Sequence, residues 1–257
     1  MTLLRNLSQF LDETLHVADI PDYDRALNGL HLANTGEVHR IVAAVDFSLE
    51  TVRQAVAAKA DLLIVHHGMF WNGIQPLVGI PYERIRLAVT HDLAVYASHL
   101  PLDYHETLGN NALLAAQLDL TVDSRFGRYR SIELGFSGIA EMLTADVAAR
   151  IRTFAEPLGA RVVMTPHDEG RRTYRWAIVT GAGASSDILQ EATDRQVDTL
   201  IVGEGPHHTA VDALERQVVV IYAGHYATET LGVQALAAEL RRIFNLPWSF
   251  IHVPTGL

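Results

Sequence analysis

Paired histidines follow a run of apolar residues in the first half of the chain. Residues 61–68 read Asp-Leu-Leu-Ile-Val-His-His-Gly, so four apolar residues lead directly into His66 and His67. This pattern predicts a buried strand that ends in a turn. Ligands and catalytic groups of open α/β sheets gather outside the carboxyl ends of the strands. Imidazole is the commonest metal ligand, so the pair indicates a metal site, although a single histidine there would more often be a satisfied surface residue.

A second apolar strand, residues 93–98, ends at His99 and is followed closely by Asp103. Pro101 lies between these two residues. Proline disrupts regular helix, so we expect Asp103 to lie on a loop rather than in a helix. Asp103 could add one carboxylate donor to those of the histidine pair.

The second half of the chain ends a comparable strand at His225, and Glu229 follows four residues later. We expect a helix from His225 through Arg242. Residues four apart share one face of a helix, so this imidazole and this carboxylate could reach the same metal ion.

Of the residues at these strand ends, three imidazoles and two carboxylates could converge, and the chain contains no cysteine. This set exceeds what one tetrahedral ion needs and suits two ions about 3.5–4 Å apart. Zinc, manganese and iron all accept such ligands. The alternative is five unrelated capping and turn residues. Their recurrence at equivalent strand ends favours the metal site, whose ligands would be His66, His67, Asp103, His225 and Glu229.

These strand ends are equivalent because the chain repeats an α/β unit. With an offset of 137 residues, the strand residue Ile41 matches Ile178 and Ser48 matches Ser185. At the same offset, Asp-Leu-Leu-Ile-Val at 61–65 matches Asp-Thr-Leu-Ile-Val at 198–202. Further on, Tyr-Ala-Ser-His at 96–99 matches Tyr-Ala-Gly-His at 222–225. We therefore predict an α/β protein of internally duplicated repeats with mixed sheets. The first repeat would cover residues 1–125 and the second residues 126–257, intertwined around one shared dimetal site.

Hydrophobic periodicity gives the expected elements of each repeat. Helices are expected over 2–15, 48–60, 82–91 and 144–158, and strands over 40–46, 61–66, 93–98, 161–164 and 174–180.

Two features could serve an anionic ligand. The turn Gly181-Ala182-Gly183 before Ser185 and Ser186 resembles an anion-binding loop at a helix start, although a tight βα turn explains it at least as well. Arginines gather between and within the halves, and a solvated surface is their simplest interpretation. Those arginines are Arg125, Arg128, Arg130, Arg171, Arg172 and Arg175.

Composition excludes several classes of protein. The 257 residues are 49% hydrophobic, which is ample for a large core, and the formal charge is −10. That charge disfavours direct binding to nucleic acid or to anionic membranes. Without cysteine there is no disulfide and no thiolate metal site. The sequence begins without a signal peptide and contains no apolar run of membrane-spanning length, so we expect a cytoplasmic protein.

Several of these motifs resemble the NIF3-like family, also called GTP cyclohydrolase 1 type 2 homologues. The resemblance rests on His-His-Gly after an apolar strand, Ser-His-Leu-Pro-Leu-Asp at 98–103 and Ala-Gly-His-Tyr-Ala-Thr-Glu at 223–229. It implies an intertwined α/β fold, two divalent metal ions per chain and a homohexamer. The family's metal ligands map onto the five residues assigned above, and His99, Glu204, His207 and His208 would be neighbours of the site.

The resemblance implies a metal-dependent hydrolase that acts on a small nucleotide-like or cyclic C–N substrate, with GTP as the first compound to test. His208 or His99 is the expected proton shuttle. The alternative is a non-catalytic module, either a metal-binding hexameric scaffold or a regulatory protein-interaction module. Both alternatives use the same ligand set.

Overall fold

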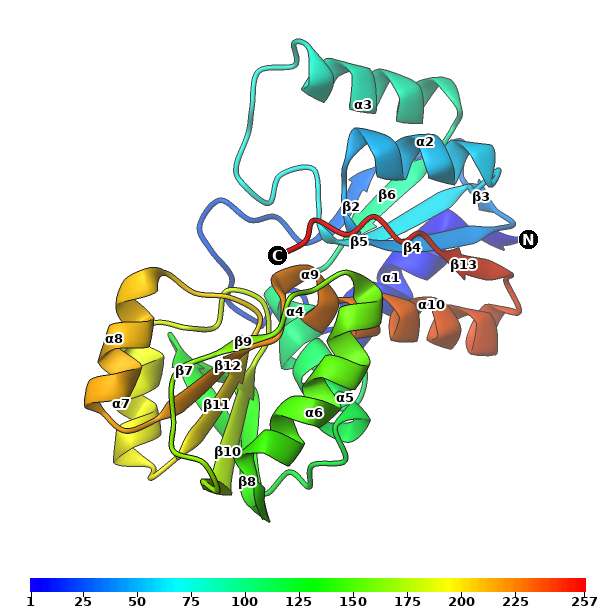
Figure 1. The fold of residues 1–257 in the computed structure, drawn as a ribbon. Coiled ribbons are helices and arrows are strands. Elements are labelled where there is room, and N and C mark those ends of the chain that lie inside the picture. Colours follow the sequence, from blue (N-terminus) through cyan, green and yellow to red (C-terminus); the bar gives the residue numbers. More distant parts are fainter. The chain divides into compact units, whose positions relative to one another are not determined.

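The computed structural model describes residues 1–257 and divides into two compact units. Unit 1 comprises Met1–Leu102 and Gly232–Val253, and unit 2 comprises Asp103–Leu231 and Pro254–Leu257. Each unit is a layered α/β structure around one mixed sheet (Figure 1). The predicted repeats have one boundary in the sequence, whereas each compact unit is assembled from two segments of the chain. Each unit therefore contains residues from both halves.

Unit 1 is built on a five-stranded sheet in the order β13-β4-β5-β6-β2. All neighbours are parallel except β2, which is antiparallel to β6. A two-stranded ribbon of β1 and β3 accompanies the sheet. The strands are β1 (Thr2–Leu3), β2 (Gly29–Leu32), β3 (Glu37–Val38), β4 (Ile41–Asp46), β5 (Leu62–His67), β6 (Ala94–Ala97) and β13 (Trp248–Phe250).

Helices cover both faces of this sheet (Figure 1). On one face α2 (Leu49–Ala57) and α3 (Ile80–Thr90) bury the apolar side chains of Val42, Leu63 and Val95. On the other face lie α1 (Leu4–Thr14) and the part of α10 (Thr230–Phe244) that belongs to this unit. Phe10 and Phe244 join these two helices edge to face, with ring centroids 5.4 Å apart. Burial on both faces explains why the central strands read as continuous apolar runs.

Unit 2 is built on a six-stranded sheet in the order β7-β8-β10-β11-β12-β9. Its centre, β10-β11-β12, is parallel, and the remaining pairs are antiparallel. The strands are β7 (Ser124–Tyr129), β8 (Ile132–Leu143), β9 (Val163–Met164), β10 (Arg172–Val179), β11 (Thr199–Val202) and β12 (Val219–Tyr222). The helices are α5 (Asn110–Gln117), α6 (Thr144–Ala155) with the 3-10 turn η1 (Glu156–Leu158), α7 (Ser186–Asp194) and α8 (His207–Glu215).

The two units repeat the same local chemistry, which confirms the duplication. Ser48 caps α2 by accepting from the backbone N–H of Thr51, and Ser185 caps α7 by accepting from that of Ile188. Capping at equivalent places is a sequence-encoded helix start. Asp61 and Asp198 also have the same role, because each carboxylate accepts two adjacent backbone N–H groups. Asp61 binds those just before β4, and Asp198 binds two within β10.

Those aspartates also correct the alignment of the first strands. Asp61 binds the N–H of Arg40, and Asp198 binds that of Arg175, so these strands are related by an offset of 135 (175 minus 40). The expected offset of 137 holds for the serines and aspartates but is wrong for β4 and β10. The second repeat therefore has two extra residues between its first strand and Ser185, in the segment that contains Gly181.

The third strands are also displaced from their expected match. By strand pairing Tyr96 corresponds to Ile221 rather than to Tyr222. A shift of one residue turns a side chain to the opposite face of the sheet. The Tyr96 hydroxyl accordingly donates to Asp12 of α1, whereas the Tyr222 hydroxyl lies 3.3 Å from Thr209 of α8. The alignment of the two tyrosines was wrong.

The repeats exchange the helix that follows their third parallel strand. Helix α5 follows β6 of the first repeat, yet Leu114 and Leu118 pack with Trp176 in the core of unit 2. Helix α10 follows β12 of the second repeat but enters unit 1 at Gly232. After α10 the chain forms β13, which is an edge strand of the unit 1 sheet and pairs with β4. This exchange is what makes the fold intertwined.

Two local predictions fail around these crossings. Asp103 is not on a loop, because α4 (Leu100–Tyr104) includes it and Pro101 occupies the helix's first turn, where a missing N–H costs nothing. The helix expected to run without interruption from His225 is instead broken at Glu229, between α9 (His225–Thr228) and α10. None of the helices combines the length and apolar character needed to cross a bilayer.

Candidate metal centre

Three histidine side chains of unit 1 gather at the carboxyl ends of β5 and β6. The ring centroids of His66 and His67 are 4.8 Å apart, and those of His66 and His99 are 5.0 Å apart. All three side chains are buried, and their possible ligand atoms lie within 4.8 Å of one another. Histidines packed this closely in a buried site suit a shared cation, because three imidazolium groups would repel one another.

Each of these imidazoles is oriented through its Nδ1 atom. His66 Nδ1 donates to the carbonyl oxygen of Ser98 at 2.9 Å. His67 Nδ1 lies 2.8 Å from Asp46 Oδ1, and His99 Nδ1 lies 2.9 Å from Asp22 Oδ1. A proton held on Nδ1 places the lone pair of a neutral ring on Nε2. Carboxylate or carbonyl partners of this kind typically fix the tautomer of metal-binding histidines.

The strands place these partners without distortion. Asp46 is opposite His67 in the parallel pairing of β4 with β5, so the carboxylate and the imidazole share the end of the sheet. Trp71 stacks on the His67 ring, with centroids 4.1 Å apart and planes inclined by 29°. At Gly68 an added Cβ would come within 2.4 Å of the His31 ring and of the Ala97 side chain. Glycine is therefore required where the chain leaves β5.

Asp22 ties an irregular segment of unit 1 to this cluster. Besides His99, its carboxylate accepts from the side chain of Asn28 at 2.9 Å and from the backbone N–H of Leu100 at 3.1 Å. Burial alone would raise the pKa of Asp22, but the hydrogen bond and charge of His99, with the bond from Asn28, lower it below its usual value. Asp22 is therefore an anion that holds His99 in place.

Unit 2 contains a histidine between two carboxylates. His225 Nδ1 lies 2.8 Å from Glu204 Oε1, and His225 Nε2 lies 3.2 Å from Glu229 Oε1. Burial opposes the charge of this imidazole, but Glu229 and then Glu204 outweigh that effect and raise the pKa of His225 to about 9. Nε2 and the Glu229 carboxylate could ligate the same cation, which would replace the proton.

The remaining carboxylate, Asp103, is also fixed within unit 2. Its Oδ1 accepts from Asn110 at 2.8 Å and from the Thr180 hydroxyl at 3.4 Å. Gly181 follows Thr180 with a φ of +62°, and a Cβ there would come within 2.2 Å of Glu229 Oε1. The glycine thus leaves the space that the Glu229 carboxylate occupies.

The donor chemistry of both units fits divalent metal ions. Unit 1 offers imidazoles, and unit 2 offers an imidazole with carboxylates, so both could bind metal without a thiolate. Of the expected ligands, His66 and His67 belong to unit 1 and the other three to unit 2. His99 lies in the unit 1 cluster. His208 is exposed in the first turn of α8 and belongs to none of the possible metal-binding groups.

Sequence reasoning missed the carboxylates that orient the histidines. Asp46 closes a predicted strand, and alignment of the strand ends with β5 could have identified it as a partner of His67. Asp22 lies in an irregular segment far from His99 in sequence, so no periodicity indicates it. Glu204 was expected to be a neighbour of the site, and the structure places it against His225.

The glycine turn of residues 181–186 is a tight connection. The Gly181 N–H donates to the Thr228 hydroxyl, and a Cβ on Gly183 would come within 2.1 Å of the Val179 carbonyl oxygen. Ser185 caps α7, and the Ser186 hydroxyl donates to Asp212. Since these groups serve the fold, the structure favours the tight-turn interpretation over anion binding.

Comparisons with known proteins identify the family of the chain and agree with its fold. A family model described as Duf34/NIF3 (NGG1p interacting factor 3) matches residues 2–255. A Deinococcus radiodurans protein named GTP cyclohydrolase 1 type 2 homolog is 40% identical, over 98% of this chain and 93% of its own. A Pyrococcus abyssi protein of the same name is 39% identical, over 96% and 97%. A crystal structure of a Thermus thermophilus protein has a TM-score of 0.85 at 34% identity, over 98% and 99%. The chain belongs to the Duf34/NIF3 family.

Proposed function

We propose that the chain is a metal-dependent hydrolase with a dinuclear centre. The observation that carries this proposal is the orientation of the histidines: His66, His67 and His225 each engage an oxygen acceptor through Nδ1, which directs Nε2 to a ligand role. With Asp103 and Glu229, they provide the five ligands for two divalent ions, which would be zinc, manganese or iron.

Three of the proposed ligands lie close in sequence to the points where the chain passes from one unit to the other. His99 and Asp103 flank the point after Leu102 where the chain passes from unit 1 to unit 2. His225 and Glu229 shortly precede the second passage, at Gly232.

Divalent ions in such a centre lower the pKa of water and polarise the bond that water attacks. His99 is suited to the accompanying proton transfer. Its Nδ1 is held by the Asp22 anion, so Nε2 can accept a proton while Asp22 stabilises the resulting imidazolium. We therefore assign proton transfer to His99 in preference to His208, which is exposed on α8 and lacks such a partner.

The proposed substrate is a small nucleotide-like molecule or another cyclic C–N compound. The names of the related proteins make GTP the first compound to test. Opening a purine ring requires attack by water on an electron-poor carbon and transfer of a proton to the departing nitrogen, which are the two operations assigned above. A homohexamer is proposed as the working assembly.

The test measures metal content and turnover together. We expect about two metal equivalents per chain and hydrolysis of GTP or of one member of a panel of cyclic amides and phosphodiesters. Asp103→Ala/Glu229→Ala should lose metal and reduce turnover by at least 100-fold. Glu50→Gln, which changes an exposed carboxylate on α2, is the matched control and should retain both. Two bound metals without turnover of any compound would favour the non-catalytic module, and less than half an equivalent would contradict both.

A further inference from the structure

Arginine side chains line a cavity in unit 2 beside the β7–β8 hairpin. The cavity has a volume of about 460 Å³, within the range of small-molecule sites. Its lining residues are Tyr104, Arg125, Arg128, Arg130, Ser131, Ile132 and Glu133. We call this cavity the arginine pocket. Three guanidinium groups in one cavity are notable in a chain whose formal charge is −10.

Arg125 is held rigidly at the inner wall of the arginine pocket. Its Nη1 donates to the backbone carbonyl of Tyr104 at 2.8 Å. The guanidinium also lies over the rings of Tyr104 and Phe136, at 4.2 and 4.4 Å from their centroids. A guanidinium ordered by stacking loses little further entropy when it binds an anion.

The acidic residue that lines the pocket is already paired. Glu133 accepts from Arg195 Nη1 at 3.1 Å, outside the lining set. The Arg128 side chain forms no ion pair with a carboxylate, since its backbone N–H, not its guanidinium, is the group that contacts Glu191. Arg125 Nη2 lies 3.3 Å from the exposed carboxylate of Glu106, which is also outside the lining set. The lining set itself therefore contains three guanidinium groups and one carboxylate.

Three further arginines of unit 2 lie outside the arginine pocket and serve the fold. Arg171 donates to the carbonyl oxygens of Asp198 and Gln217, Arg172 donates to that of Glu141, and Arg175 lies 3.5 Å from Asp123. These contacts join strands and turns. The arginines that we expected to form a solvated surface thus fall into two groups. One group makes structural contacts, and the other lines the arginine pocket.

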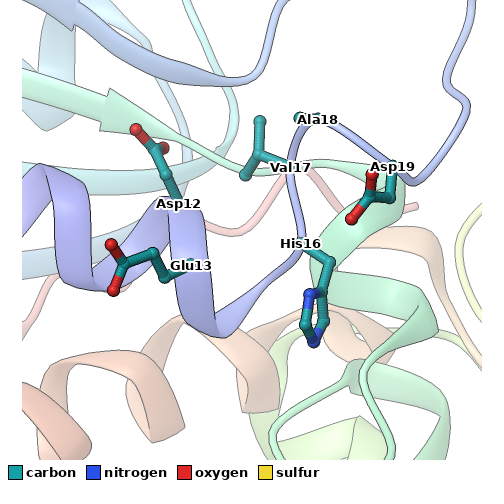
Figure 2. Close-up of a pocket in the computed structure, with 6 residues that line it drawn as sticks. All are labelled: Asp12, Glu13, His16, Val17, Ala18 and Asp19. Carbon is teal, nitrogen blue, oxygen red and sulfur yellow. The ribbon is translucent and has the colours of Figure 1, made fainter.

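A second cavity shows the opposite chemistry. It lies at the end of α1 in unit 1 and is lined by Asp12, Glu13, His16, Val17, Ala18 and Asp19 (Figure 2). Its three carboxylates would repel an anion. Positive charge in a cavity is therefore a local property of unit 2 rather than of the chain's surface in general.

The geometry points to the arginine pocket as the binding site for the phosphate chain of a small substrate. Guanidinium forks match phosphate oxygens in geometry and charge. Tyr104, which lines the pocket, directly follows the proposed ligand Asp103, so α4 carries both a pocket residue and a proposed metal ligand. This inference rests on the proposed function for the role of the anion as part of a substrate.

The net charge limits the size of the anion. Local guanidinium groups dominate within a Debye length of about 8 Å at physiological salt, whereas a longer polyanion meets the acidic surface beyond it. We therefore assign the pocket to di- and triphosphates rather than to nucleic acid.

The test is calorimetric titration of the full-length protein with inorganic triphosphate, both as purified and after chelation of metal. We expect Arg128→Gln/Arg130→Gln to weaken triphosphate binding at least tenfold in both preparations while metal content stays unchanged. Arg53→Gln, which removes an exposed charge from α2 of unit 1, should leave the affinity within twofold. Circular dichroism verifies that each variant is folded.

Three results separate this inference from the proposed function. Triphosphate binding that survives the double substitution and disappears on chelation would overturn the pocket but leave the metal centre standing. Arginine-dependent binding by a protein that takes up no metal would support the pocket and contradict the hydrolase. Equal affinity for citrate, or tighter binding of a single-stranded 12-mer DNA, would overturn the assignment to small phosphate chains.

Discussion

At the scale of single residues, the histidine rings of unit 1 are oriented by oxygen atoms of residues that are not themselves expected to bind metal. Asp46, Asp22 and the Ser98 carbonyl each engage one Nδ1 atom, and each comes from a different part of the chain. The types of residue that bind metal could be read from the sequence because they follow apolar strands. Their orientation could not, because it depends on partners brought together by the fold.

Asp46→Asn tests this orientation directly. Asparagine keeps the size and one acceptor oxygen but removes the negative charge that strengthens His67 as a ligand. We expect metal affinity to fall about tenfold, the lower end of the range for such partners, with the fold intact. Competition with a chromophoric chelator measures the affinity. Glu50→Gln is the control on the adjacent helix, and equal affinities in both variants would refute a role for Asp46.

The protonation of His225 gives a prediction for the metal-free chain. Its pKa is raised from 6.5 to about 9 by Glu229 and Glu204 acting against burial, so the charged ring stabilises the fold. That contribution is fully present below pH 6.5 and is lost as pH rises through about 9. Thermal unfolding should therefore show a loss of stability between pH 7 and pH 10.

Glu204→Gln isolates the cause of this pH dependence. Removing one of the two carboxylates should lower the pKa of His225, measured by NMR titration of its ring proton in metal-free protein. The loss of stability should then begin at lower pH. Glu215→Gln removes an exposed carboxylate at the end of α8 and should change neither quantity. A His225 pKa that is the same in both variants would exclude Glu204 as a cause.

At the scale of elements, local signals were sufficient for the strands and the caps. Ser48, Ser185, Asp61 and Asp198 act within a few residues or across one strand pair, so their roles repeat wherever the motif repeats. The exact pairing of strands was less accessible. Two apolar strands match equally well at several offsets. The alignment of Tyr96 with Tyr222 rested on a chance identity, one residue away from the pairing in the structure.

Hydrophobic periodicity could not predict the exchange of α5 and α10 between the units. An amphipathic helix shows that it must bury an apolar face, but its sequence does not state against which of two similar sheets. The predicted boundary between the repeats, at residue 125, therefore reflects the duplication in the sequence and not the packing of α5 and α10. The positions of Asp103 and Glu229 beside the crossings became clear only from the contacts of the helices that follow them.

Leu114→Ala tests the exchange. Leu114 is fully buried in the core of unit 2, so truncation should cost about 2–5 kcal/mol. Although α5 belongs to the first repeat, hydrogen exchange should accelerate in β10 and β11 more than in β4 and β5. Leu63→Ala, in the core of unit 1, should give the reverse pattern. Loss of protection in β4 and β5 caused by Leu114→Ala would contradict the assignment of α5.

At the scale of the whole molecule, negative charge and exposed apolar surface act on association in opposite directions. The charge of −10 opposes contact between copies except where apolar burial compensates. One segment of unit 1 offers such burial. From the end of β5 into the first turn of α3 the exposed apolar side chains are Trp71, Ile74, Leu77, Val78, Ile80 and Tyr82. Monomeric proteins rarely expose large contiguous apolar patches.

We expect this segment to be covered in the proposed homohexamer. Light scattering at micromolar concentration should give about six times the 28.3 kDa of one chain. Ile74→Glu/Val78→Glu adds charge to the segment and should shift the mass toward smaller species, because unpaired carboxylates would have to be buried. Ile139→Glu changes another exposed isoleucine, on β8 of unit 2, and should leave the mass unchanged. A mass of 28.3 kDa for the unaltered chain would contradict the hexamer. A hexamer that survives the double substitution would exclude this segment as its interface.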